Sequence, residues 1–198
     1  MNWGILKPME SKEDPKCFII KSHEKEWAFD QNILCRISPV FEAMLLNPRT
    51  IECQKNQMNL EGVSEEILDV FHNLMTKWTD TAIYEFCMGF TNSGIIYTKY
   101  DNEIISNLLV FADKYLMEPL IELCIFLITT SLRNENVLDV LKMAHFLNNQ
   151  KLLKIATAFS INNCCQENLS EDQQKEWNEF ISLNPNCVAK MMTSLVMK

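Results

Sequence analysis

The sequence predicts an α+β domain followed by an all-α extension. Two short apolar runs, Cys17 to Ile20 and Glu26 to Phe29, have the length and pattern of strands. From Asn102 to Lys198, apolar residues instead recur at helical spacing. The 198 residues include only four glycines and six prolines, which favours helices over a glycine-rich β fold. A few strands interleaved with helices, followed by helical hairpins, indicate this fold class.

The first part of the chain predicts a β-hairpin, two short helices and a third strand. Ser22 to Lys25 supply the turn between the two apolar runs. Ile33 to Ile37 is the first short helix. Ser38-Pro39 starts the second, because serine caps a helix and proline is tolerated at its first position. Gln57 to Leu60 is the third strand.

Helices account for most of the remaining chain. Ser64 is a good N-cap, and the acidic residues after it suit the positive end of the helix dipole. Pro119 opens another helix. The apolar faces that predict helices run over Ile67 to Leu74, Ile105 to Leu116, Leu120 to Ile128, Val137 to Ala144, Leu152 to Phe159, Trp177 to Ile181 and Val188 to Leu195.

Composition excludes several classes of function. The formal net charge of −8, without a dense run of lysine and arginine, argues against binding nucleic acid. No apolar run reaches about 18 residues, so we expect no membrane span. Met1 to Pro8 lacks the apolar core of a signal peptide, which favours a reducing compartment. We therefore expect most of the eight cysteines to be small buried side chains and not disulfides.

No catalytic, cofactor-binding or metal-ligating motif is evident. The four glycines form neither a dinucleotide-binding nor a phosphate-binding loop. The cysteines include no C-x-x-C, and the three histidines His23, His72 and His145 lack a metal-ligand spacing. One span from Trp78 to Tyr100 is rich in aromatic residues, which predicts either a hairpin packed on the core or an exposed recognition surface.

Several stretches, in this order and spacing, resemble one known family. Ile33-Leu34 with Ser38 to Met44 resembles its first helical hairpin, and Ala112 to Tyr115 resembles a late helix. Glu135 to Asn163 resembles its 3-box helical pair, and Trp177 to Leu195 resembles the last helices of its truncated BACK region. The family is the BTB/POZ domain with its helical extension, as in the speckle-type POZ proteins.

The resemblance implies a BTB/POZ fold, which is a small sheet flanked by helical hairpins, followed by an all-α extension. It implies an N-terminal segment over 1–16, a BTB/POZ domain over 17–130 with an insertion at about 78–95, and 3-box and partial BACK helices over 131–198. It further implies a homodimeric adaptor without enzymatic activity, in the cytoplasm or nucleus, that recruits cullin-3, the scaffold of a ubiquitin ligase. The residues expected to contact cullin-3 are Thr50, Ile51, Glu52, Tyr115, Val137 and Leu141. The residues expected at the dimer interface are Trp3, Ile5, Leu6, Ile33 and Ile37.

The chain also departs from the family pattern. Asp30 stands where the family has a histidine, and Thr50 stands where the cullin-contact loop has a large apolar residue, a role that Ile51 could take. The expected dimerisation segment, Met1 to Lys16, is short, and the substrate-binding MATH domain is absent. Three alternatives stay open: a scaffold that pairs with other BTB proteins independently of cullin, a relative of the potassium-channel tetramerisation domains, and an enzyme.

Overall fold

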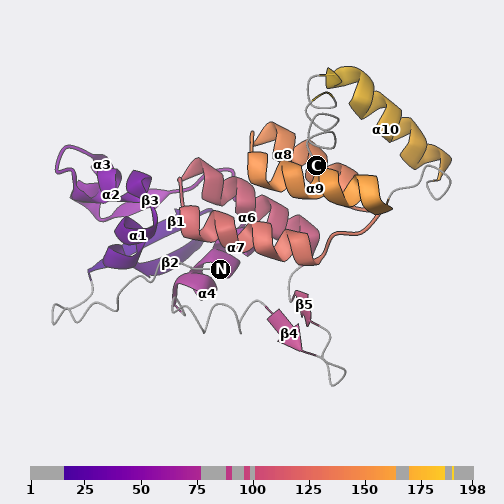
Figure 1. Ribbon diagram of the computed structural model, residues 1–198. Helices are drawn as coiled ribbons and strands as arrows, with labels where there is room; N and C mark the ends of the chain where they lie inside the picture. Colours follow the sequence, from indigo (N-terminus) through magenta and orange to yellow (C-terminus); the bar gives the residue numbers. More distant parts are fainter. Residues whose placement is uncertain are drawn as a thin grey trace. The chain divides into compact units, whose positions relative to one another are not determined.

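The computed structural model describes residues 16–76, 88–90, 96–98, 101–163, 170–185 and 189. The chain divides into two compact units, Met1–Cys124 (unit 1) and Ile125–Lys198 (unit 2). Unit 1 holds the strands with their helices, and unit 2 is helical throughout its described part. The predicted α+β class is confirmed by this arrangement (Figure 1). The division between the units falls within a helix, and the predicted domain boundary after residue 130 stays a prediction.

Three strands form one small sheet in the order β2-β1-β3. The hairpin predicted from the two apolar runs is confirmed: β1 (Cys17–Ser22) and β2 (Lys25–Asp30) pair antiparallel, with Phe18 opposite Phe29. The third strand, β3 (Gln57–Asn59), pairs parallel with β1. Alternate residues of the hairpin are buried, as expected when one face of a sheet is covered.

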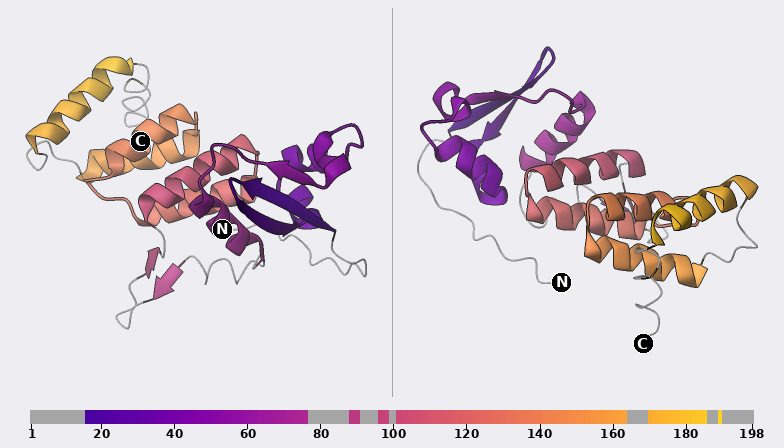
Figure 2. Two further views of the ribbon diagram at one scale, coloured as in Figure 1. Left: turned by 180° about the vertical axis from the view of Figure 1, so that it is seen from behind. Right: turned by 90° about the horizontal axis from the view of Figure 1, so that it is seen from above.

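The second of the two helices that follow the hairpin begins at its predicted cap, and the first begins at a cap that was not predicted. α1 (Gln31–Ile37) begins after Asp30, whose carboxylate accepts a hydrogen bond of 2.8 Å from the Asn32 amide. Asp30 therefore has a local structural role at the position where the family resemblance implies a histidine. α2 (Pro39–Leu46) begins with proline after the Ser38 cap. In both views of Figure 2, α1 and α2 lie beside the sheet of unit 1.

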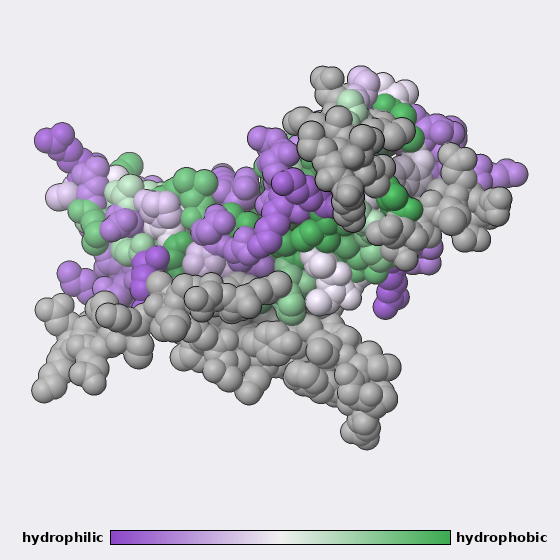
Figure 3. Space-filling view, in the orientation of Figure 1, coloured by the Kyte–Doolittle hydropathy of each residue, from purple (hydrophilic) through white to green (hydrophobic). Residues whose placement is uncertain are grey.

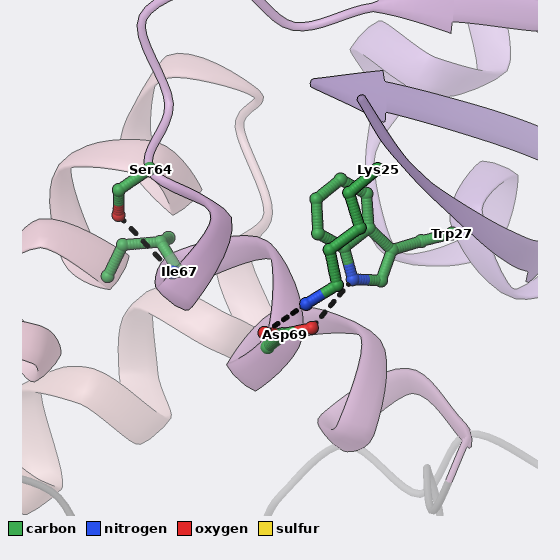
Figure 4. A network of polar contacts seen from close by, with 5 residues as sticks. All are labelled: Lys25, Trp27, Ser64, Ile67 and Asp69. Carbon is green, nitrogen blue, oxygen red and sulfur yellow. Dashed lines mark hydrogen bonds and ion pairs between the residues drawn. The ribbon is translucent and has the colours of Figure 1, made fainter. Parts of the chain in front are cut away.

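The carboxylate of Asp69 on α4 (Glu65–Thr76) accepts hydrogen bonds from the hairpin (Figure 4). Asp69 accepts hydrogen bonds from Lys25 Nζ at 2.6 Å and from Trp27 Nε1 at 2.9 Å. Ser64 caps the same helix, with its hydroxyl accepting from the Ile67 amide at 3.4 Å. The hydrogen bonds to Asp69 hold the pKa of its carboxyl below the ordinary value, with Lys25 as the largest cause.

A chain of aromatic contacts runs through the core of unit 1. It begins at Phe29 of β2 and passes to Phe71 of α4 at 5.1 Å between ring centroids, and then to Phe111 of α6 (Asn102–Lys114), also at 5.1 Å. Phe111 lies 5.0 Å from Tyr115, which stacks on Phe41 of α2 at 4.9 Å with an 8° angle between the rings. These contacts connect the sheet to α2 through two helices.

The predicted aromatic insertion lies mostly outside the described residues. Two short strands within it, β4 (Met88–Phe90) and β5 (Ile96–Thr98), pair antiparallel. Trp78, Tyr84 and Tyr100 lie outside the described residues. The choice between a packed hairpin and an exposed recognition surface stays open.

Unit 2 is built on an antiparallel helical hairpin. α7 (Glu118–Thr130) crosses the division between the units, and α8 (Val137–Phe146) packs on α9 (Gln150–Asn163). Asn148 supplies the left-handed turn between α8 and α9 with a φ of 50°, and the Asn149 side chain caps α9 through the Leu152 amide at 2.9 Å. α10 (Glu171–Leu183) follows, opened by a capping box at Ser170. The predicted helix over Val188 to Leu195 lies outside the described residues apart from Ala189.

The expectation that most cysteines are buried is wrong for the cysteines that the structure describes. Cys124 is buried, whereas Cys17 is exposed, and Cys35 and Cys53 are partly exposed. Cys17 is the first residue of β1, and Cys35 and Cys53 lie on the short helices α1 and α3, where none of the three is fully covered by the core.

The described residues contain neither a membrane-spanning helix nor a metal-binding cluster. None of the helices in the described ranges combines the length and apolarity that a membrane crossing requires. Across these ranges no group of three histidine, cysteine or acidic side chains is placed to hold a metal ion.

Candidate functional site

The candidate site is the exposed surface formed by the end of α2 and the start of α3 (Ile51–Lys55), called here the α2–α3 surface. Two large apolar side chains dominate it: Leu46 is 59% exposed and Ile51 is 63% exposed. A shallow hollow of about 430 Å³ adjoins Leu46 and is also lined by Pro39, Glu42, Ala43 and Asn47. Apolar side chains with an acidic rim are thus presented to solvent in one region of unit 1.

Figure 3 shows this combination at the surface. Hydrophobic residues, in green, lie between hydrophilic ones, in purple, over the part of the chain that carries α1 to α3, at the left of the view. Most large apolar side chains of unit 1 are buried instead. Leu46 and Ile51 are therefore exposed apolar side chains that do not pack in the core of unit 1.

Thr50 fixes the start of α3. Its hydroxyl accepts a hydrogen bond of 3.3 Å from the Cys53 amide, which makes it the N-cap, and lies within hydrogen-bond distance of the Met44 and Asn47 carbonyls. The sequence prediction of a contact loop at Thr50 to Glu52 is wrong in its local structure, because these residues are the cap and first turn of a short helix. The Thr50 hydroxyl is thus engaged in hydrogen bonds within this segment, whereas the neighbouring Ile51 side chain faces solvent.

The connection between α2 and α3 is tightly bonded. The Asn47 side chain accepts from the Arg49 amide at 3.0 Å, and the Gln54 side chain donates to the Pro48 carbonyl at 2.9 Å. Asn56 ends α3 in the left-handed conformation with a φ of 52°. Ile51 is therefore displayed on a segment whose backbone is held at both ends, which lowers the entropy lost when a partner binds.

Tyr115 positions α2 from inside unit 1. Only 6% of Tyr115 is exposed, and its ring stacks on Phe41 of α2. Its carbonyl accepts a hydrogen bond of 2.5 Å from the hydroxyl of Ser38, which also caps α2 by accepting from the Phe41 amide at 3.0 Å. Burial raises the pKa of the Tyr115 phenol. The structure thus places Tyr115 behind the α2–α3 surface and not on it.

The remaining residues predicted for cullin contact lie in the core of unit 2. Val137 and Leu141 are both 0% exposed on α8. Of the six predicted contact residues, the structure gathers Thr50, Ile51 and Glu52 at the start of α3, and Glu52 is half-buried there. The side chains of Tyr115, Val137 and Leu141 are buried in the folded chain, and their part in a cullin contact stays a prediction.

The predicted dimer residues are divided in a similar way. Trp3, Ile5 and Leu6 lie outside the described residues. Ile33 is half-buried on α1, whereas Ile37 is 2% exposed and belongs to the core. Ile33 is therefore the described member whose side chain remains partly open to solvent.

Leu46 is the exposed apolar residue of this surface that the sequence did not lead us to expect. Successive residues of a helix point about 100° apart, so adjacent leucines cannot both face a narrow core stripe. Leu45 is 2% exposed and Leu46 is 59% exposed. The Leu45-Leu46 pair at the end of a short helix was the signal that could have identified it.

The chain is similar to solved structures, but its sequence matches no model of a known protein family. Among solved structures, the chain is similar to the BTB (Tramtrack and Bric a brac) domain of human gigaxonin, with 19% sequence identity and a TM-score of 0.36. The match covers 54% of this chain and 72% of that chain. The described part of the chain itself shows a small three-stranded sheet with its helices, followed by helices alone.

Proposed function

We propose that the chain is a protein–protein interaction adaptor of the BTB type, which self-associates and recruits cullin-3 for ubiquitination of a substrate. The observation that carries the proposal is the α2–α3 surface. It combines the exposed Ile51 and Leu46 with the acidic Glu42 and Glu52, and a hollow lined by Pro39, Glu42 and Leu46 adjoins it. A surface of this kind binds other proteins, because it combines apolar anchors with a polar rim.

Ile51 is the main anchor in this proposal. Full burial of an isoleucine side chain contributes about 1.5–3 kcal/mol, and Ile51 is 63% exposed before binding. The resemblance places a large apolar residue where this chain has Thr50, whose hydroxyl is engaged in capping α3. Ile51, next in sequence, supplies the apolar group instead.

Glu52 and Glu42 give the surface its charge. Both side chains lie in the first turns of their helices, where the helix dipole favours a negative group. The negative rim adds to a chain whose formal net charge is −8, so we expect association with a basic segment of the partner that weakens as salt concentration rises.

Tyr115, Val137 and Leu141 contribute indirectly in this proposal. Tyr115 holds the position of α2, and Val137 and Leu141 form the core under the 3-box-like helices. Substituting these residues is expected to lower stability and binding together, whereas substituting Ile51 is expected to lower binding alone.

The test is binding of the purified chain to the N-terminal domain of cullin-3, with Ile51→Asp and Glu52→Arg as the variants. Val110→Asp is the matched control, because Val110 is also an exposed apolar residue of unit 1, at 39%, on α6. We expect Ile51→Asp to weaken binding at least about tenfold, since it removes a buried anchor and adds a desolvated charge. Unchanged binding in both variants would show that the α2–α3 surface is not the cullin site.

A second candidate is a BTB scaffold that pairs with other BTB proteins independently of cullin. It is favoured by the polar Thr50, which leaves a smaller apolar contact than the family pattern implies. Self-association in either case would involve Trp3, Ile5, Leu6 and the half-buried Ile33. The scaffold predicts stable heterodimers with other BTB proteins and no complex with cullin-3, and both candidates place the protein in the cytoplasm or nucleus.

A further inference from the structure

A second hollow lies within unit 2, between α8 and α10, and has a volume of about 330 Å³. Lys142 and His145 line it from α8. Phe180 of α10 is 5% exposed and Leu183 is 71% exposed, so apolar area on α10 reaches from the core of unit 2 to solvent. The lining residues of α10 recur at i, i+3, i+4 and i+7, which places them on one side of the helix: Glu176, Glu179, Phe180 and Leu183.

The side chains around the hollow carry more negative than positive charge. Lys142 Nζ lies 3.2 Å from Glu176 Oε2 and 3.7 Å from Asp139 Oδ1, so two carboxylates share one ammonium group. Glu179 has no ion-pair partner among the residues that the structure describes. Its carboxylate is therefore a charge at the hollow that a partner can still neutralise.

Two helices end at this hollow, and their ends add to the negative charge. His145 lies in the last turn of α8, and Leu183 is the last residue of α10, with Asn184 as the C-cap that also lines the hollow. The C-terminal end of a helix carries a partial negative charge. The last turn of α10 contains no basic residue, and that of α8 contains only His145. A cation is therefore favoured over an anion at the hollow.

The lining determines which kind of partner the hollow fits. Leu183 offers apolar area that an apolar side chain can cover, and Glu179 offers a carboxylate that a lysine or arginine can pair. An acidic or purely apolar segment would cover Glu179 without pairing it, which is unfavourable. The volume is at the lower end of the range of about 300–1,000 Å³ for binding pockets, so the hollow takes side chains of a partner and not a folded domain.

We propose that the hollow between α8 and α10 is a docking site for a short segment of a partner protein that carries an apolar side chain beside a lysine or arginine. The apolar side chain packs on Phe180 and Leu183, and the cation pairs with Glu179. This binding concerns unit 2 alone and depends neither on the α2–α3 surface nor on cullin-3. In an adaptor of the proposed kind, the protein bound here would be the substrate, and that reading alone rests on the proposed function.

A displayed library of short random peptides tests the proposal on the full chain. Peptides are selected on the unmodified chain and counter-selected on Leu183→Asp, which puts a charge in the apolar lining. We expect the surviving peptides to share an apolar residue beside a lysine or arginine. Their affinity, measured by fluorescence anisotropy, should fall as the salt concentration rises.

Matched variants test whether the peptides bind at the hollow. Glu179→Lys should weaken the binding of the selected peptides at least about tenfold, because it replaces the pairing carboxylate with a like charge. Asp172→Lys makes the same change of charge in the first turn of α10, outside the lining, and should weaken binding less than about twofold. Ser182→Asp is the control for Leu183→Asp, because Ser182 is exposed and does not line the hollow.

Ile51→Asp separates this proposal from the cullin-3 proposal. It should leave the affinity for the selected peptides unchanged, because Ile51 lies in unit 1. All five substituted positions are exposed, so we expect each variant to unfold at the midpoint of the unmodified chain.

Four results would overturn the proposal. The first is the absence of any peptide that survives the counter-selection, which would mean that the hollow is closed to other chains. The second is a surviving set without lysine or arginine. The third is an equal loss of affinity in Asp172→Lys and Glu179→Lys, which would indicate a general attraction to an acidic helix. The fourth is peptide binding that weakens as the protein concentration rises, because a second copy of the chain would then occupy the hollow.

Discussion

Ser38 is the residue on which the position of α2, and hence of the α2–α3 surface, depends most directly. It is 0% exposed and makes two hydrogen bonds with one hydroxyl, accepting from the Phe41 amide at 3.0 Å and donating to the Tyr115 carbonyl at 2.5 Å. The first caps α2, and the second satisfies a carbonyl at the end of α6, where no intrahelical partner is available. Ser38→Ala removes both at once.

The expected cost follows from these two contacts. Loss of a serine N-cap destabilises by about 0.5–2 kcal/mol. A buried carbonyl left without a partner costs about 1–3 kcal/mol more. We therefore expect Ser38→Ala to lower the free energy of unfolding by about 2–4 kcal/mol.

Urea unfolding of the full chain, followed by tryptophan fluorescence to which the buried Trp27 contributes, measures this change. Ser64→Ala is the matched control, because Ser64 is an exposed N-cap with a longer bond of 3.4 Å and a single partner. We expect the control to cost about 1 kcal/mol or less. A Ser38→Ala variant no less stable than Ser64→Ala would refute the reasoning that Ser38 couples α2 to α6.

Three further predictions concern single side chains of unit 1. Asp69→Asn should lower the free energy of unfolding by only a few tenths of a kcal/mol at pH 7, because the carboxylate is partly exposed. The pKa of Asp69 is lower in the folded chain than in the unfolded chain. The difference in urea midpoint between wild type and variant should therefore disappear as the pH falls below about 4. Tyr115→Ala should cost about 3–5 kcal/mol through loss of the stacked ring, whereas Tyr115→Phe keeps the ring and should cost far less. Leu46→Lys should leave the unfolding midpoint unchanged and weaken cullin-3 binding, because Leu46 is 59% exposed.

Each of these has a result that contradicts it. For Asp69, a difference between wild type and variant that grows toward acid pH would mean that the carboxylate is not stabilised in the folded chain. For Tyr115, equal losses in the alanine and phenylalanine variants would assign the effect to the hydroxyl and not to the ring. For Leu46, a lowered midpoint would show that the side chain packs in the folded chain.

The sequence was sufficient for the elements whose patterns are local. The β1–β2 hairpin followed from two apolar runs and a turn, and the start of α2 followed from Ser38-Pro39. α3 was not predicted as a helix, because five residues are too short to show a helical period. The Thr50 cap sets the start of α3, and the left-handed conformation of Asn56 sets its end. Both depend on backbone geometry, which the spacing of apolar residues does not reveal.

The candidate site was predictable only in part. Ile51 and Glu52 came from the family resemblance, and both lie at the start of α3. Tyr115 was assigned to the surface because it lies in a recognisable motif, but its aromatic ring completes a core contact with Phe41. Burial of this kind depends on residues far apart in sequence, and periodicity within one helix does not reveal it.

Light scattering after size-exclusion chromatography, with and without the N-terminal domain of cullin-3, tests the central claim most directly. We expect the chain to elute as a dimer and to shift to a two-to-two complex with cullin-3, and we expect Ile51→Asp to remain dimeric without shifting. A chain that ignores cullin-3 at micromolar concentration would contradict the adaptor proposal and favour the cullin-independent scaffold.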